Sequence, residues 1–278
     1  YDFVSNNEML SGIREENGNP VPYDGDYIDT NTYGPIGWDD NPLDSGDWRN
    51  GNNSSWHGTY IAGLIAANTN NGIGIAGIAP DAKIQPIRAF SWRGGLLSDV
   101  IASITWASGG TVENVPANQT PAKVINLSFS VEAPCTPSLQ TAIDEAIARG
   151  SVVVAAAGNN NSDAANFAPG NCQNVITVGA IDSDGNRAAY SNFGTSVDIS
   201  APGGEIEGNA IYSTSNEGTT IAATPAYSVK QGTSISTAQV SAAIAKLAQT
   251  YPTENATQLK ARVLNGESVK PFAGGNCL

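Results

Sequence analysis

Residues 151–159 have the sequence Ser-Val-Val-Val-Ala-Ala-Ala-Gly-Asn, and this short apolar run is the strongest indicator of fold class in the chain. A run of β-branched and small residues that ends at a glycine is typical of a strand buried on both faces of a parallel sheet. Three similar runs occupy residues 83–88, 123–129 and 174–178. The sequence therefore predicts a parallel sheet built from these four strands.

Helical patterns alternate with these runs. The four candidate helices cover residues 98–107, 137–148, 233–249 and 253–264. The third is rich in Ala and Val on nearly all its faces, which indicates a buried helix. Gly150 suits the end of the second helix and Thr253 the start of the fourth, because glycine and threonine favour those positions. This alternation predicts an α/β fold: a three-layer sandwich with a mostly parallel central sheet and right-handed crossovers.

A chain of 278 residues can form one α/β domain, and neither an internal repeat nor a linker divides it. We therefore expect one domain over residues 1–278. Residues 1–55 are rich in Asn, Asp, Gly and Pro and lack periodicity, which predicts a long polar loop region ahead of an α/β body at 56–278. A loop of this length is usually functional or anchored, for example by a metal.

The charge of the chain narrows its partners. The chain has 13 Lys and Arg against 26 Asp and Glu, a net charge of -13, which repels nucleic acid and anionic membrane surfaces. No run approaches the roughly 18 apolar residues of a membrane-spanning helix. We expect neither a nucleic-acid nor a membrane partner. Residues 1–15 also lack the pattern of a signal peptide, so in an exported protein the targeting segment has already been removed.

Three cysteines, Cys135, Cys172 and Cys277, are too few for a disulfide scaffold. They are also too scattered for a zinc site, whose ligands usually come in closely spaced pairs. Two interpretations remain open: one disulfide with one remaining thiol, or three free thiols in a cytosolic protein.

Three polar residues are candidates for catalysis. Ser234 opens the buried helix, where the helix dipole and free N–H groups favour developing negative charge. Asn159 follows the 151–157 strand at its carboxyl end, where sites of open α/β sheets gather, and can donate a hydrogen bond to an oxyanion. His57 is the only histidine and precedes a helical run at 60–67. Taken singly, each also fits an ordinary role: a helix-capping serine, a turn asparagine or a surface histidine.

Together these segments resemble the subtilisin-like serine proteases, the subtilases, and among them the secreted subtilases of Gram-negative bacteria. The family order of the catalytic residues is Asp, His, Ser. The resemblance covers roughly residues 54 to 265, and the loop Asp-Ser-Gly-Asp-Trp at 44–48 is also similar. The matching motifs are His57-Gly58-Thr59, Ile125-Asn126-Leu127-Ser128, Ala156-Ala157-Gly158-Asn159 and Gly232-Thr233-Ser234.

The resemblance implies a secreted, monomeric serine endopeptidase with protein or peptide substrates and a propeptide as partner. Ser234 would attack the scissile carbonyl, His57 would transfer the proton, and Asn159 would hold the oxyanion. An extended peptide would pair with the cleft as an added strand. Ser130-Val131 replaces a Gly-Gly pair beside the cleft, which should narrow the first specificity pocket. The implied substrate-binding residues are Ser128, Phe129, Ser130, Gly94, Gly95, Ala157 and Gly158.

The triad aspartate has no match. The family carries it in a strand before the histidine, whereas Tyr-Asp-Phe-Val at 1–4 resembles the segment after that strand, and Asp-Thr-Asn at 29–31 lacks both the glycine and the strand. Loss of the aspartate's role costs roughly 10⁴ in turnover in the convergent chymotrypsin-type triad. The alternatives are a fragment that needs a complementary segment, a segment supplied by another chain, and a peptide-binding pseudoprotease. An esterase using the same Ser–His pair is a further alternative.

The resemblance also implies a disulfide between Cys135 and Cys172, and structural calcium without a catalytic cofactor. Residues 68–72, Asn-Thr-Asn-Asn-Gly, resemble a calcium loop of the family. A separate oxygen-rich calcium site is predicted from acidic residues in the polar region, which alternatively form solvated turns. The candidate ligands are Asp39, Asp44 and Asp47, with Asp40 beside them.

Overall fold

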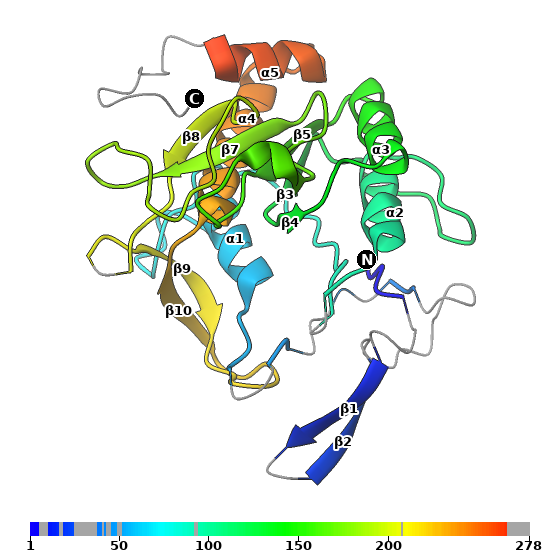
Figure 1. Cartoon of the computed structure of the whole chain (residues 1–278), viewed down its shortest axis with the longest axis vertical. Helices are drawn as coiled ribbons and strands as arrows, with labels where there is room; N and C mark the ends of the chain where they lie inside the picture. Colours follow the sequence, from blue (N-terminus) through cyan, green and yellow to red (C-terminus); the bar gives the residue numbers. More distant parts are fainter. Residues whose placement is uncertain are drawn as a thin grey trace.

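The computed structural model describes residues 1–5, 11–16, 19–24, 38–40, 42, 46–48, 52–91, 94–206 and 208–265. Its centre is a sheet of four parallel strands in the order β3-β5-β7-β8 (Figure 1). The strands are β3 (Val124–Leu127), β5 (Val152–Ala156), β7 (Ile176–Ile181) and β8 (Ile199–Pro202). The expected strands at 123–129, 151–157 and 174–178 are therefore confirmed.

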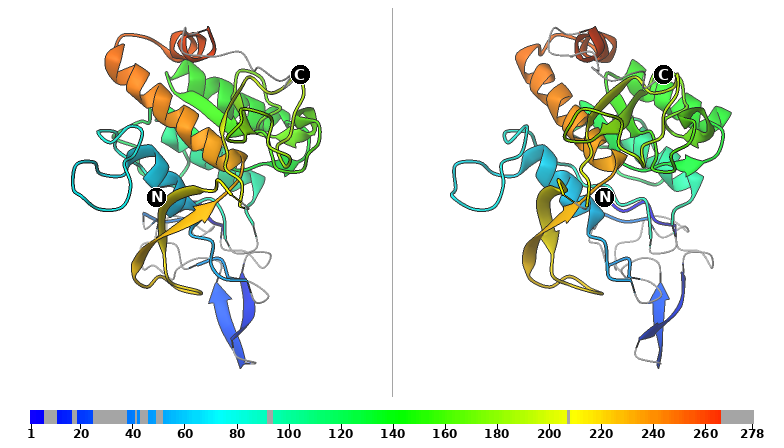
Figure 2. Two further views of the ribbon diagram at one scale, coloured as in Figure 1. Left: turned by 90° about the vertical axis from the view of Figure 1, so that its left-hand side faces the viewer. Right: turned by 60° about the vertical axis from the view of Figure 1, so that its left-hand side comes forward.

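Helices cover both faces of this sheet, which confirms the three-layer α/β sandwich (Figures 1 and 2). The helices are α2 (Leu97–Ala107), α3 (Pro137–Ala148), α4 (Thr233–Thr250) and α5 (Ala256–Asn265). In β5, Val153 and Ala155 belong to the core cluster under α2 and α3. Val152 and Val154 belong to the cluster under α4 and α5. Both faces of the strand are buried, which explains its uninterrupted apolar sequence.

Helix α1 (His57–Ala66) lies outside the sheet layers and packs against α4. It also contacts the hairpin of β9 (Ile211–Asn216) and β10 (Pro225–Lys230). A Cβ built at Gly63 would lie 2.1 Å from Thr214 Oγ1, so only glycine permits this approach of helix and hairpin. Among the described residues, no helix is long and apolar enough to cross a membrane.

A disulfide joins Cys135 to Cys172, as expected, whereas Cys277 lies outside the described residues. The disulfide lies beside a small antiparallel pair of strands, and a 3-10 turn (Ala164–Asn166) precedes the second strand of that pair. The two strands are β4 (Val131–Glu132) and β6 (Phe167–Ala168). Of the two interpretations of the cysteines, the structure selects the disulfide.

The polar region at 1–55 is not a loop throughout. β1 (Ser11–Glu16) and β2 (Asn19–Asp24) form an antiparallel hairpin that the sequence analysis missed (Figure 1). The overlooked signal is Asn-Gly at 17–18, which lies between the two paired segments and is a strong hairpin signature.

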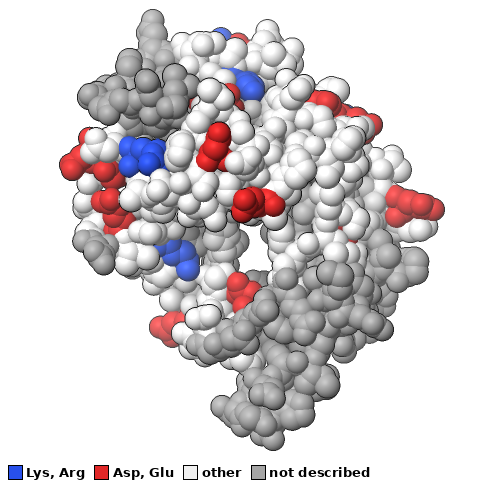
Figure 3. All heavy atoms as spheres, in the orientation of Figure 1, with Lys and Arg blue, Asp and Glu red and all other residues white. Residues whose placement is uncertain are grey.

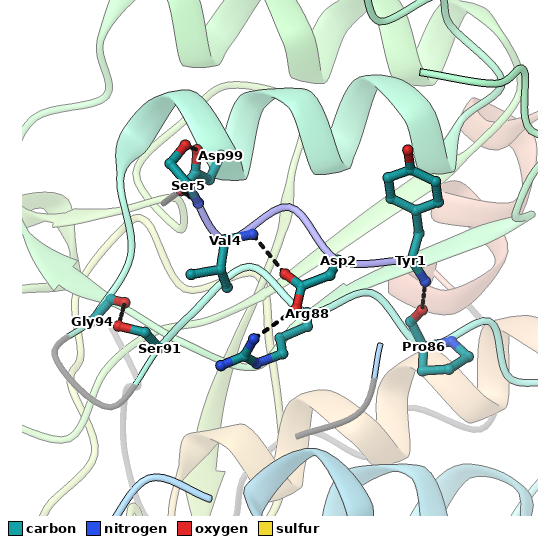
Figure 4. A network of polar contacts seen from close by, with 9 residues as sticks. All are labelled: Tyr1, Asp2, Val4, Ser5, Pro86, Arg88, Ser91, Gly94 and Asp99. Atoms are coloured by element: carbon teal, nitrogen blue, oxygen red, sulfur yellow. Dashed lines mark hydrogen bonds and ion pairs between the residues drawn. The ribbon is translucent and has the colours of Figure 1, made fainter. Parts of the chain in front are cut away.

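The prediction of a buried strand at 83–88 is wrong. Only Arg88 pairs in parallel fashion: its N–H donates to Tyr1 O at 3.0 Å, and its carbonyl accepts from Phe3 N at 2.8 Å. Pro86 has no N–H to donate to a ladder. Arg88 also forms a buried salt bridge of 2.6 Å with Asp2, whose other carboxylate oxygen accepts from Val4 N (Figure 4). This segment is therefore held by the N-terminal residues and not by the central sheet.

Helix α5 begins later than expected. Asn255 Oδ1 accepts from Gln258 N at 3.0 Å, and Gln258 Oε1 accepts from Asn255 N at 3.0 Å. This reciprocal capping box fixes the first turn, so Asn255 rather than Thr253 caps the helix. Gly150 follows α3 with a φ of 103°, as its proposed role at the helix end requires.

Candidate active site

His57 is the first residue of α1, and the residues before it anchor this helix end. The carboxylate of Asp47 accepts from Ser55 N at 2.5 Å and from Ser55 Oγ at 2.6 Å. Ser55 Oγ in turn accepts from His57 N at 3.3 Å. Trp56 has a φ of 49°, and its indole Nε1 donates to Gly218 O at 2.6 Å. The imidazole is therefore carried on a fixed backbone.

The environment of His57 keeps its imidazole neutral. Burial lowers its pKa below the usual value, and the positive charge of Lys230 lowers the pKa further, while Asp47 opposes both. A neutral imidazole at neutral pH can accept a proton, as a general base must. Sequence reasoning missed Lys230, because only the fold brings β10 to the start of α1.

Ser234 is the second residue of α4, as the sequence predicts. Its Oγ donates to Ser128 O at 2.9 Å, and Ser128 Oγ donates to Ser234 O at 2.8 Å. Its hydroxyl thus lies between the N-terminal turn of a helix and the segment that follows β3. The structure thus brings together Ser234 and Ser128, which the sequence predicts as the nucleophile and a substrate-binding residue.

Asn159 lies three residues beyond the end of β5, beside the start of α4. Its Oδ1 accepts from Thr233 N at 2.8 Å and from Thr233 Oγ1 at 3.0 Å. Because a backbone N–H can only donate, the oxygen must face Thr233, and Nδ2 points to the other side. Within the described residues, Nδ2 makes no hydrogen bond, so it is available to an oxyanion. Sequence reasoning did not reveal that Thr233 orients this side chain, because the two residues lie far apart in the chain.

The first turns of α1 and α4 contact each other. Tyr60 and Ile61, one turn after His57, share a buried cluster with Ile235 and Ala238 of α4. His57 and Ser234 therefore lie at adjoining helix ends. Among the residues that the structure describes, no hydrogen bond joins the imidazole of His57 to Ser234 or to a carboxylate.

The predicted substrate-binding residues lie around these helix ends. Ser130 approaches Gly158, where an added Cβ would be 3.1 Å from Ser130 Oγ. Phe129 packs edge-on against Phe90, with ring centroids 4.7 Å apart. Ala157 is buried and its N–H donates to Val178 O, so it supports the sheet as well as the cleft.

The other predicted edge of the cleft is only partly open to a peptide. Gly94 exchanges two backbone hydrogen bonds with Ser91, at 2.8 and 3.1 Å. A substrate strand therefore cannot use the N–H and carbonyl of Gly94 without displacing Ser91. Gly95 follows directly, and a Cβ there would lie 2.4 Å from Ala89 O, which requires glycine at this position.

The predicted calcium ligands are not gathered in the described part of the chain, where no group of three acidic, histidine or cysteine side chains could hold a metal. Asp47 is engaged by Ser55, and Asp39 is buried with its backbone paired to Asp2. Asp44 lies outside the described residues. In the 68–72 loop, Asn71 Oδ1 accepts from Ile73 N at 3.0 Å. Calcium binding thus stays a prediction of the family resemblance.

A parallel α/β sandwich that brings a serine, a histidine and an asparagine amide to adjoining helix starts has the architecture of the subtilisin-like serine hydrolases. The model of the subtilase family matches residues 20–271, and the chain belongs to that family.

Two similar proteins are named as extracellular proteases. The "Extracellular protease" of Xanthomonas campestris pv. campestris is 45% identical over 226 residues, which are 78% of this chain and 38% of that protein. The "Extracellular basic protease" of Dichelobacter nodosus is 39% identical over 249 residues, 85% of this chain and 39% of that protein. The chain thus spans less than two fifths of the length of either relative.

A solved protease structure from Pseudoalteromonas arctica superimposes with a TM-score of 0.80 at 36% identity. The match covers 98% of this chain and 77% of that one.

Proposed function

We propose that this chain forms the body of a secreted serine endopeptidase that cleaves peptide bonds through an acyl-enzyme on Ser234. The observation that carries the proposal is the orientation of Asn159. Thr233 holds its Oδ1, so Nδ2 is presented beside the N-terminal turn of α4, which also offers the Ser234 N–H. Two such donors in one place suit a tetrahedral oxyanion.

In the proposed reaction, the Ser234 hydroxyl leaves Ser128 O and turns to His57. Its oxygen attacks the scissile carbonyl while His57 takes the proton, and Asn159 Nδ2 with Ser234 N–H stabilises the oxyanion. His57 then gives the proton to the leaving amine, and the acyl-enzyme forms. A water molecule, deprotonated by His57, releases the acid and restores Ser234.

Protein or peptide substrates, an extracellular location and a monomeric state belong to the same proposal. The relatives named as extracellular proteases support secretion, as does the Cys135–Cys172 disulfide, which persists in oxidising compartments. The described face in Figure 3 carries more acidic than basic side chains, in line with the net charge of -13. Such a surface disfavours nucleic acid as a partner.

Full activity also requires a carboxylate at His57, and we propose that a complementary segment supplies it. Two features support this proposal. The first is that β3 is an edge strand, with β5 on one side and no other described strand on the other. The second is a hollow of about 660 Å³ that runs along α1 from Gly58 to Ala67. It is lined in part by Gly58, Thr59, Ala62, Ile84 and Pro86. An extended segment that occupied this hollow would reach the start of α1.

The test is intact mass after treatment with a fluorophosphonate, which labels only activated serines, alongside Ser234→Ala and a circular-dichroism check of folding. One adduct that is lost in Ser234→Ala supports an activated serine. Absence of the adduct on folded wild-type protein contradicts a protease active in this form.

A peptide-binding pseudoprotease is the second candidate. It is favoured by the Ser234 hydroxyl, which donates to Ser128 O, and by the absence of any hydrogen bond between the His57 imidazole and the described residues. Incubation with a fluorescent peptide library separates the two functions. Retention of uncleaved peptide by unlabelled protein favours binding alone, whereas cleavage favours the peptidase.

A further inference from the structure

Asn192 is a buried asparagine with no assigned role, and it encloses the turn that carries Asn159. Its Nδ2 donates to Ala157 O at 2.9 Å, and its Oδ1 accepts from Asn160 N at 2.9 Å and from Ser162 N at 3.1 Å. Its backbone N–H donates to Gly158 O at 2.9 Å. With 1% of its surface exposed, the side chain is committed to this turn. It forms hydrogen bonds to residues on both sides of Asn159 and none to Asn159 itself.

The close fit of this amide explains the glycine at position 158. A Cβ on Gly158 would lie 2.3 Å from Asn192 Nδ2, and the φ of 107° at this position also favours glycine. The turn and the amide are therefore shaped for each other. Loss of the amide would leave the buried carbonyl of Ala157 without this donor.

The neighbouring Tyr190 connects the same segment to the helix that carries Ser234. Its backbone carbonyl accepts from Asn161 N at 2.9 Å, and its hydroxyl oxygen accepts from Gly232 N at 3.2 Å. The hydroxyl also donates to Gly204 O at 2.9 Å, and burial raises the pKa of Tyr190 to about 12, so the proton stays in place. Residues 190–192 thus contact both the Asn159 turn and the start of α4.

From this geometry we propose that Asn192 is a positioning residue of the oxyanion site. The two proposed donors, Asn159 Nδ2 and Ser234 N–H, come from different elements, so their spacing depends on the segment that links them. Asn192 fixes the Asn159 side of that spacing. The proposal rests on the proposed function, since it assigns a role within the same reaction.

The test compares second-order rates of Ser234 labelling by a fluorophosphonate, whose phosphoryl oxygen occupies the oxyanion site. We expect Asn192→Ala to slow labelling about tenfold, because small displacements of a catalytic group are costly. Asn159→Ala, which removes the donor itself, should cost about 10²-fold. In the Asn159→Ala background, adding Asn192→Ala should change the rate less than about twofold, since the two residues act through one donor.

Asn118→Ala is the matched control. Asn118 is a buried asparagine whose Nδ2 donates to Trp106 O and whose Oδ1 accepts from Thr120 N, away from the site. Its loss should leave the labelling rate unchanged. Asn192→Asp keeps both acceptor contacts and loses the donor to Ala157 O, and it serves if Asn192→Ala does not fold. An unchanged rate in Asn192→Ala, equal slowing in both backgrounds, or equal slowing in Asn118→Ala would overturn the proposal.

Hydrogen exchange separates failure of this proposal from failure of the proposed function. If wild-type protein takes no label, the proposed function fails, and the exchange of the Asn160 and Ser162 amides then decides the role of Asn192. Faster exchange of these two amides in Asn192→Ala, with no change in Asn118→Ala, supports the role of Asn192 in holding the 157–162 turn. Unchanged protection overturns it.

Discussion

Ser234 and Ser128 are joined by two reciprocal hydrogen bonds, each running from one hydroxyl to the backbone carbonyl of the other residue, at 2.9 and 2.8 Å. Ser128 Oγ also accepts from Asn126 Nδ2, and Asn126 Oδ1 accepts from Ser241 Oγ, both at 2.9 Å. The proposed nucleophile is therefore tied to the end of β3 by a chain of side chains. This tie fixes its backbone and occupies its hydroxyl.

Replacing Ser128 by alanine should slow fluorophosphonate labelling of Ser234 about fivefold, because a neutral hydrogen bond contributes about 1 kcal/mol. The rate is measured by intact mass over time. Ser151→Ala is the control, since its buried hydroxyl donates to Ala122 O at 2.6 Å far from the site. Equal rates in Ser128→Ala and wild type would show that the hydrogen bond from Ser128 Oγ to Ser234 O does not position the nucleophile.

The single histidine allows its pKa to be measured directly by NMR titration of the His57 ring protons. We expect a pKa below 6.5, since burial and Lys230 both disfavour the charged form. Lys230→Gln should raise the pKa, and Asp47→Asn should lower it. A pKa above 6.5 would contradict this environment and would point to a carboxylate at the imidazole.

The same depressed pKa makes stability depend on pH. The unfolded chain binds a proton at His57 more readily than the folded chain, so the stabilisation is present above about pH 6.5 and is lost as the pH falls toward the folded pKa. Urea unfolding at pH 7 and pH 5 should therefore show a larger loss of stability in wild type than in His57→Gln. Equal losses in the two proteins would refute the linkage.

Replacing each of two glycines in α1 by alanine should have opposite effects on stability. At Gly63 an added Cβ would meet Thr214 Oγ1 at 2.1 Å and Ser213 Oγ at 2.7 Å, whereas at Gly58 it meets nothing within 4 Å. Gly63→Ala should destabilise the protein by about 1–3 kcal/mol through overpacking. Gly58→Ala should be neutral or stabilising by up to about 1 kcal/mol, because alanine favours a helix. Thermal unfolding of both variants decides the matter, and similar effects would contradict the close contact of α1 with β9.

The disulfide should contribute strongly to stability. It closes a loop with a sequence separation of 37, for which chain entropy gives about 4 kcal/mol. The double variant Cys135→Ser and Cys172→Ser should lower the free energy of unfolding by about this amount in urea. A reducing agent should reproduce the effect in wild type and leave the variant unchanged. If the reducing agent alters both equally, the effect does not come from this bond.

Local sequence patterns predicted three strands of the central sheet. The runs at 123–129, 151–157 and 174–178 became strands because burial on both faces demands continuous apolar residues. The same pattern failed at 83–88, since a strand also needs neighbours, and Pro86 and the pairing with Tyr1 and Phe3 left only Arg88 in a bridge. The hairpin at 11–24 was predictable from Asn-Gly at 17–18 and was overlooked among polar residues.

The sequence by itself determined the family, the α/β layers and the candidates Ser234, His57 and Asn159, because short motifs and apolar periodicity are local properties of the chain. Only the tertiary structure decided that Thr233 turns the Asn159 amide, that Lys230 lies near His57, and that Asn192 encloses the 157–162 turn. These contacts join residues between 30 and 173 positions apart. Hydrogen bonds act over about 3 Å and charges over roughly 10 Å in space. A local pattern in the chain therefore does not reveal which distant residues meet.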